Sequence, residues 1–268
     1  MVRELLAVEP RRPHPPGACC HVMELRQYTL HPDQRETFIE LFDSTFADPL
    51  DATGMTVIGQ FRDLDRPDRF VWMRGFKDMR SRARELAAFY DGALWRAHRD
   101  EANACIVDSD NVLLLENASP EFVFKNIAPR PRANAIAPVG LVLISLYYTQ
   151  YTTARSPGAF ATLFDRSLRR HTEEAGARTL AMYTTSRQEN NFPRLPVRVG
   201  EHIFVWVAQF TNIDAYAAYE EKLAANAKWR HTLWPTARSR LSRDPEVLRL
   251  TPTSRSRLRG KRWIHRPE

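Results

Sequence analysis

The chain has 268 residues, of which 43% are hydrophobic and 26% charged, as in an ordinary globular protein with room for one large domain or two smaller ones. Its longest apolar stretch, residues 139–148, is shorter than the roughly 20 residues that a membrane helix needs, and it is rich in β-forming residues. This stretch is therefore predicted to be a buried strand rather than a membrane helix.

Residues 1–21 predict a disordered leader. Charges and prolines interrupt the apolar core that a secretory signal would need, and its glutamates argue against a transit peptide. The cysteines, Cys19, Cys20 and Cys105, have no CxxC spacing for a metal or redox site. We therefore expect a cytoplasmic protein.

Residues 22–117 predict the element order βαββαβ. The first helix carries one apolar stripe that would face a sheet, made of Phe38, Leu41, Phe42, Phe46 and Leu50. The expected elements are a strand at 22–30, a helix at 33–52, a hairpin of strands at 55–62 and 69–76, one or two helices over 79–103, and a last strand at 112–115.

The same pattern recurs in the second half. The segment FIELFD at Phe38 returns as FATLFD at Phe160, a shift of 160 − 38 = 122 residues, and FVWMRGF at Phe70 returns as FVWVAQF at Phe204, a shift of 204 − 70 = 134. The difference, 134 − 122 = 12, is an insertion within residues 186–200. Residues 140–252 are therefore predicted to be a second repeat.

Residues 118–139, which include four prolines, predict a linker between the repeats. Each repeat would cover one face of its sheet with helices, and the two open faces can pack together. The sequence thus predicts an α+β fold in which two ferredoxin-like βαββαβ repeats form a dimeric α/β barrel within one chain.

The net charge of +7 is concentrated in a basic tail, residues 253–268. Because this tail has one Trp and no interleaved aromatic residues, we expect a solvated terminus rather than a nucleic-acid-binding segment. Its cations are Arg255, Arg257, Arg259, Lys261, Arg262 and Arg266.

Several segments of the first half resemble the NIPSNAP family: MELRQYTL from Met23, GQFRD from Gly59, RFVWMRGF from Arg69, WRAHRDEAN from Trp95 and DSDNVLLL from Asp108. The second half keeps the FVW strand and a Trp-Arg pair, so only the fold carries over there. The resemblance implies a dimeric α/β-barrel architecture, which cofactor-free monooxygenases, haem enzymes and proteins of no known activity share.

Polar residues alternate along two predicted strands. Glu24, Arg26 and Tyr28 share one face of the first strand, and Trp72 and Arg74 share one face of the third. These strands are neighbours in a ferredoxin-like sheet, so the sequence predicts a charged cluster inside the barrel that is either a space-filling ion pair or a substrate site.

The corresponding strands of the second half lack this charge. Ala208 stands at the repeat of Arg74, and residues 141–148 are uncharged. One charged wall facing an apolar, aromatic wall that includes Trp206 would suit an amphipathic small molecule, although the tryptophans are more simply interpreted as core residues than as a cofactor site.

Histidine is the natural acid or base near neutral pH, and two histidines are candidates. His98 follows the Trp95-Arg96 pair, and His171 continues the apolar stripe of the second repeat; Tyr28 is a further catalytic candidate. Each histidine could instead be a structural hydrogen-bonded residue. His98 and Glu101 could face one metal ion, but no third ligand and no haem signature are visible, so we expect neither cofactor.

Two functions fit these features. The favoured one is a small-molecule enzyme of the isomerase, cyclase, lyase or cofactor-free oxygenase type. It lacks a nucleotide cofactor, because no GxGxxG, GxxxxGK, GxSxG or HExxH motif occurs. Arg26 or Arg74 would orient the carbonyl or carboxylate of a mainly apolar substrate in the barrel, and His98 or His171 would move a proton. The alternative is a non-catalytic binding or stress-related protein with a solid barrel, which acts through homo-oligomerisation.

Overall fold

The structure is a computed structural model that describes residues 18–150, 152 and 155–260. The first repeat has the predicted order. Its strands are β1 (Val22–Leu30), β2 (Thr56–Asp63), β3 (Arg69–Phe76) and β4 (Ile106–Asn117). Its helices are α1 (Arg35–Leu41), the π-helical segment η1 (Phe42–Phe46), α2 (Ala47–Ala52), α3 (Met79–Tyr90) and α4 (Ala93–Ala104).

The second repeat follows the same order. Its strands are β5 (Leu141–Tyr148), β6 (Arg178–Thr185), β7 (Ile203–Phe210) and β8 (Glu246–Pro252). Its helices are α5 (Pro157–Leu163), the π-helical segment η3 (Phe164–Leu168), α6 (Arg169–Ala175), α7 (Ile213–Ala225), the π-helical segment η4 (Trp229–Leu233) and α8 (Trp234–Arg238). The π-helical turn recurs at the same place in both repeats, since Phe42 and Phe164 are separated by the shift of 122 residues.

Strand β4 is longer than the predicted strand 112–115. Its N-terminal part is polar and largely exposed, so it lacks the apolar signal on which the prediction relied, but it still pairs with β1 through Asp108 opposite Thr29 and Ile106 opposite Leu30. Backbone pairing, which any residue except proline can make, extends the strand here.

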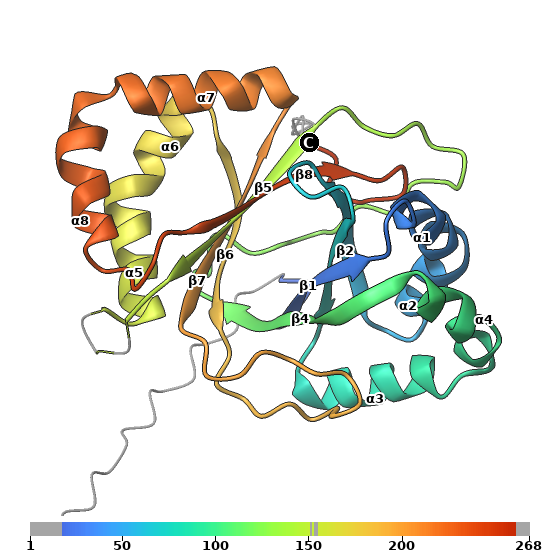
Figure 1. The fold of residues 1–268 in the computed structure, drawn as a ribbon. Coiled ribbons are helices and arrows are strands. Elements are labelled where there is room, and N and C mark those ends of the chain that lie inside the picture. Colours follow the sequence, from blue (N-terminus) through green and yellow to red (C-terminus); the bar gives the residue numbers. More distant parts are fainter. Residues whose placement is uncertain (1–17, 151, 153–154, 261–268) are drawn as a thin grey trace, which may run out of the picture.

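The eight strands form one closed barrel in the order β1-β3-β2-β8-β5-β7-β6-β4, and all pairs are antiparallel. The two sheets join through β2 with β8 and through β4 with β6. The helices of the two repeats lie on opposite sides of the barrel (Figure 1). This arrangement confirms the predicted fold class.

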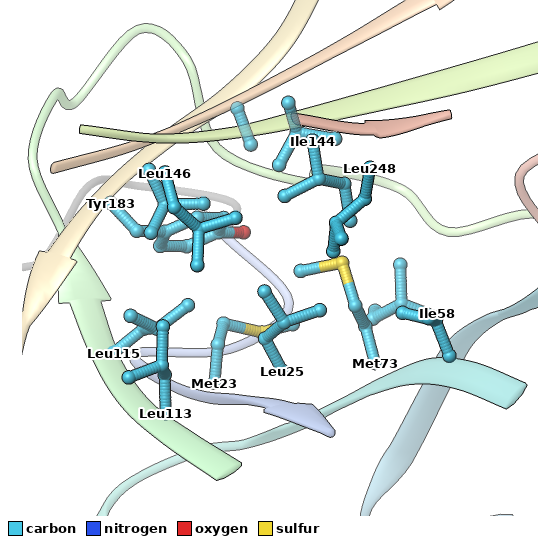
Figure 2. Packing of buried hydrophobic residues seen from close by; sticks show 14 of the residues in the cluster. Met23, Leu25, Ile58, Met73, Leu113, Leu115, Ile144, Leu146, Tyr183 and Leu248 are labelled. Atoms are coloured by element: carbon cyan, nitrogen blue, oxygen red, sulfur yellow. The ribbon is translucent and has the colours of Figure 1, made fainter. Parts of the chain in front are cut away.

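Apolar side chains from all eight strands fill the barrel. Met23, Leu25, Met73, Ile144 and Leu248 belong to one buried cluster, and Figure 2 shows such side chains meeting between the strands. An eight-stranded barrel has an interior just wide enough for side chains, so this interior is packed as a core.

The prediction that Glu24, Arg26 and Arg74 lie inside the barrel is wrong. Their neighbours in the strands, Met23 and Leu25, occupy the interior, while Tyr28 packs with the helix-side cluster of the first repeat. Alternation identifies which residues share a face but does not say which face is inside. Here the apolar face turned inward.

The tail is docked over residues 253–260, which corrects the expectation of a solvated terminus for that part; residues 261–268 lie outside the described residues. Arg255 is 7% exposed and its guanidinium binds both Asp48 oxygens at 2.8 Å and the carbonyl of Asp43 at 2.6 Å. Arg130 of the linker binds Asp51 of the same helix at 2.6 Å. Linker and tail are thus both anchored on α2.

Replacing Arg255 by Ala should lower the free energy of unfolding by about 2 kcal/mol, because a buried, charge-assisted hydrogen-bond donor is lost. Arg249→Ala, which removes a half-exposed pair with Asp65, is the matched control and should cost below about 1 kcal/mol. Urea unfolding followed by circular dichroism measures both. Equal effects of the two substitutions would mean that the docked tail adds no stability.

Candidate functional site

A single carboxylate, Glu24 on β1, binds three guanidinium groups on the helix-covered face of the first sheet. Glu24 Oε2 accepts from Arg26 Nη1 and from Arg74 Nε, both at 2.8 Å, and Oε1 accepts from Arg82 Nε at 2.7 Å. All four side chains are at most 1% exposed. Strand register explains part of the cluster, since Glu24 lies directly opposite Arg74, and α3 adds Arg82 from above.

This cluster holds more positive than negative charge. Burial disfavours the Glu24 carboxylate, but the charges of Arg74, Arg26 and Arg82 together outweigh burial and hold the pKa of Glu24 well below its usual range. Aromatic faces take up part of the excess positive charge: the Arg74 guanidinium carbon lies 4.9 Å from the Trp72 ring centre, and that of Arg26 lies 5.8 Å from it.

Two of the arginines also hold tyrosine hydroxyls. Arg26 Nε donates to Tyr28 Oη at 3.1 Å, and Arg74 Nη1 donates to Tyr90 Oη at 3.4 Å. Burial raises the pKa of Tyr28 even though the Arg26 charge opposes it, so this phenol keeps its proton near neutral pH. Because each phenol oxygen accepts from an arginine, its own O–H stays available to donate to a further group.

A cavity of about 90 Å³ lies next to these phenols, between the helices and the sheet of the first repeat. Aromatic and aliphatic side chains make most of its wall, with Phe42, Phe46 and Phe89 among them, and the helical part of the wall comes from α1, η1, α2, α3 and α4. The side chains in the wall that carry hydrogen-bonding groups are Tyr28, Trp72, Tyr90, Trp95, Asn103 and Ser109.

Trp72, one of the residues that line this cavity, carries an indole N–H without an acceptor among the described residues. Its side chain is 2% exposed and its Nε1 has no hydrogen-bond partner among the described residues. Its repeat, Trp206, donates to Thr179 Oγ1 at 3.2 Å. The position of Thr179 is occupied in the first repeat by Val57, which has no acceptor side chain. A buried N–H left unpaired costs free energy, so this group favours a ligand that supplies an oxygen.

The second repeat keeps the aromatic frame and lacks the charges. By strand register, Leu143 faces Ala208 where Glu24 faces Arg74, and Ser145 faces Trp206 where Arg26 faces Trp72. Tyr147 stands where Tyr28 stands. The two repeats thus provide a matched pair, one with the cluster and one without it.

The structure separates the other predicted site residues from this cluster. His98 on α4 is about a third exposed, and its Nδ1 lies 3.3 Å from Glu101 Oε2. Its ring packs against Phe46, so it lies one side chain behind the cavity wall. His171 and Trp206 belong to the second repeat, where His171 Nδ1 lies 3.7 Å from Glu174 Oε2. The roles predicted for them remain predictions.

Sequence reasoning missed Arg82 and Tyr90, which lie eight residues apart on α3. Their helical positions do not reveal that they reach a strand residue, although an arginine on the apolar side of a helix, as Arg82 is, could have drawn attention. Within residues 18–150, 152 and 155–260, no group of three or more His, Cys, Asp or Glu side chains could hold a metal ion. Among the same residues no helix is long and apolar enough to span a bilayer.

Residues 23–120 match the model of the NIPSNAP family. The chain therefore contains a NIPSNAP domain. This domain coincides with the repeat that carries the charged cluster and the cavity. No curated protein matches the chain.

Solved structures share the whole fold at low sequence identity. A candidate monooxygenase from Lactobacillus acidophilus NCFM has a TM-score of 0.53 and 11% identity, over 87% of this chain and 94% of that one. One from Fusobacterium nucleatum subsp. nucleatum ATCC 25586 has a TM-score of 0.54 and 10% identity, over 90% and 96%. An anthrone oxidase-like protein has a TM-score of 0.54 and 11% identity, over 88% and 93%. At these identities the likeness extends to the barrel and no further.

Replacing Glu24 by Gln should lower the free energy of unfolding by about 3 to 5 kcal/mol near neutral pH, because three buried guanidinium groups lose their counterion. The folded-state pKa of Glu24 is depressed, so its contribution is complete above the unfolded pKa of about 4.3 and is lost as the pH falls below that value. The gap between wild type and variant should therefore be constant between about pH 6 and pH 8 and should shrink in acid.

Urea titrations across this pH range give the gap directly. Glu36→Gln, which breaks an exposed pair with Arg62, is the control and should cost below about 1 kcal/mol. A Glu24→Gln protein as stable as the wild type would show that the cluster does not need its carboxylate.

Proposed function

We propose that this protein binds a mainly apolar small molecule through a carbonyl oxygen in the cavity of its NIPSNAP domain and acts on it without a nucleotide cofactor. The observation that carries the proposal is the indole N–H of Trp72, which has no partner among the described residues and belongs to a residue that lines a mainly aromatic and aliphatic cavity. Tyr28 and Tyr90, each held through its oxygen by an arginine, supply further donors in the same wall.

Such donors suit chemistry that makes a carbonyl oxygen more negative. Hydrogen bonds from fixed, buried groups stabilise the charge that grows on the oxygen when a neighbouring C–H bond loses its proton. Isomerisation, cyclisation, elimination and direct oxygenation of activated ketones all pass through that enolate. The cationic cluster behind the tyrosines would add a favourable potential at the same oxygen, since it carries three guanidinium groups for one carboxylate.

A specific feature favours a second candidate, a non-catalytic binding protein. Among the described residues, the cavity wall contains no His, Asp, Glu, Lys or Cys side chain that could act as a general base on a ligand there. His98, which lies behind Phe46, would have to reach past the aromatic wall to take a proton. Binding alone needs only the donors and the apolar wall.

Acetophenone and ethylbenzene test the carbonyl site, because they have nearly the same shape and only the first has a carbonyl oxygen. Wild type should bind acetophenone roughly tenfold more tightly, the effect of one or two net hydrogen bonds. Trp72→Phe should reduce this preference, whereas Trp206→Phe, the same change in the other repeat, should retain it. Isothermal titration calorimetry measures all the affinities.

The hydrocarbon corrects for any change in cavity size that the substitutions cause. Equal affinities of wild type for the two ligands, or an unchanged preference in Trp72→Phe, would contradict the proposed site. Incorporation of deuterium into the methyl group of bound acetophenone in heavy water separates the two functions: catalysed exchange supports the enzyme, and binding without exchange supports the binding protein.

A further inference from the structure

The loop between β6 and β7, residues 186–200, belongs to the second repeat and packs on the first. It contains the insertion of 134 − 122 = 12 residues relative to the turn at residues 63–68. In Figure 1 this loop extends from the ends of β6 and β7 to α3 of the first repeat. We refer to residues 186–200 as the lid loop.

Polar contacts fix the lid loop to α3 and to the charged cluster. Arg82 Nη1 donates to Asn190 Oδ1 at 3.0 Å and to Asn191 Oδ1 at 2.8 Å, while its Nε binds Glu24. Asn191 Nδ2 in turn donates to the carbonyl of Met79 at 2.5 Å, at the start of α3. The same buried carboxylate therefore positions both the tyrosines of the cavity and the loop beside it.

Further contacts hold the loop at other points. Arg194 pairs with Asp91, just after α3, at 2.8 Å, and the backbone N–H of Arg198 donates to the carbonyl of Val112 in β4 at 2.8 Å. The lid loop is therefore tied to α3, to the α3–α4 turn and to β4. A loop held at three separate elements has a defined position, in contrast to an unattached surface insertion.

Apolar residues of the lid loop complete the cavity. Leu195 lines it, and Phe192 is 8% exposed with its ring centre 6.1 Å from that of Tyr90. Both side chains pack with the aromatic cluster of the first repeat. Among the described residues that line the cavity, Leu195 is the one that comes from the second repeat.

We infer that the lid loop is the specificity element of the cavity, and that Leu195 limits the length of the ligand that it accepts. The inference rests on the proposed function in taking this cavity as the binding site. It assigns the second repeat, which lacks the charged cluster, the role of closing the site of the first. A ligand that extends toward the lid loop would meet the Leu195 side chain, which lines the cavity.

Ethylbenzene and butylbenzene test the inference, because they differ in chain length and neither needs the carbonyl site. Leu195→Ala removes the branched end of the side chain and should raise the affinity for butylbenzene relative to ethylbenzene roughly tenfold, as expected for burying two more methylene groups. Val199→Ala in the same loop is the control, since Val199 is 81% exposed, and it should leave the ratio unchanged. Calorimetry gives the affinities, and thermal melts show that both variants fold.

An unchanged ratio in Leu195→Ala, or an equal change in Val199→Ala, would overturn the inference, and so would a wild type that binds neither hydrocarbon. These outcomes are separate from failure of the carbonyl site. A protein that selects hydrocarbons by length through Leu195, but binds acetophenone no better than ethylbenzene, would support the lid loop while contradicting the proposed function.

Discussion

The buried Glu24 carboxylate is the interaction on which the site depends. Through Arg26 it positions Tyr28, through Arg74 it positions Tyr90, and through Arg82 it positions the lid loop. A carboxylate removed from water is stable only when it is paired and fully hydrogen-bonded, and the three guanidinium groups meet that condition. This one carboxylate therefore orients both the tyrosine hydroxyl groups beside the cavity and the lid loop.

The two repeats show how one fold can be divided between two tasks. Both keep the aromatic frame on the helix side of the sheet, with Trp72 and Trp206 as equivalent residues. In the second repeat Thr179 accepts the indole N–H and uncharged residues replace the cluster, so that side is a satisfied core. In the first repeat the indole N–H of Trp72 has no partner among the residues that the structure describes. The free donor and the excess charge occur together, which argues for a ligand rather than a packing defect.

Much of the fold could be predicted from the sequence, because the spacing of the FVW strands and of the helix stripes repeats along the chain. The contact of Glu24 with Arg74 could be predicted too, since it follows from the strand order of a ferredoxin-like sheet. The face that these residues occupy could not, because alternation is symmetric with respect to the two faces. The roles of Arg82 and of the lid loop could not be predicted either. Arg82 binds Glu24 at a sequence separation of 58 residues, and Leu195 reaches the cavity from the other repeat, so neither contact leaves a local pattern in the sequence.

The indole N–H signals of Trp72 and Trp206 in a ¹⁵N-correlated NMR spectrum test most directly whether a ligand oxygen binds at the unpaired donor. Addition of acetophenone should shift the Trp72 signal downfield, as a new hydrogen bond does, while Trp206, already bonded to Thr179, should stay in place. Ethylbenzene should not produce the downfield shift. A Trp72 signal that is unmoved by acetophenone, or that responds equally to both compounds, would contradict a carbonyl-binding site in this cavity.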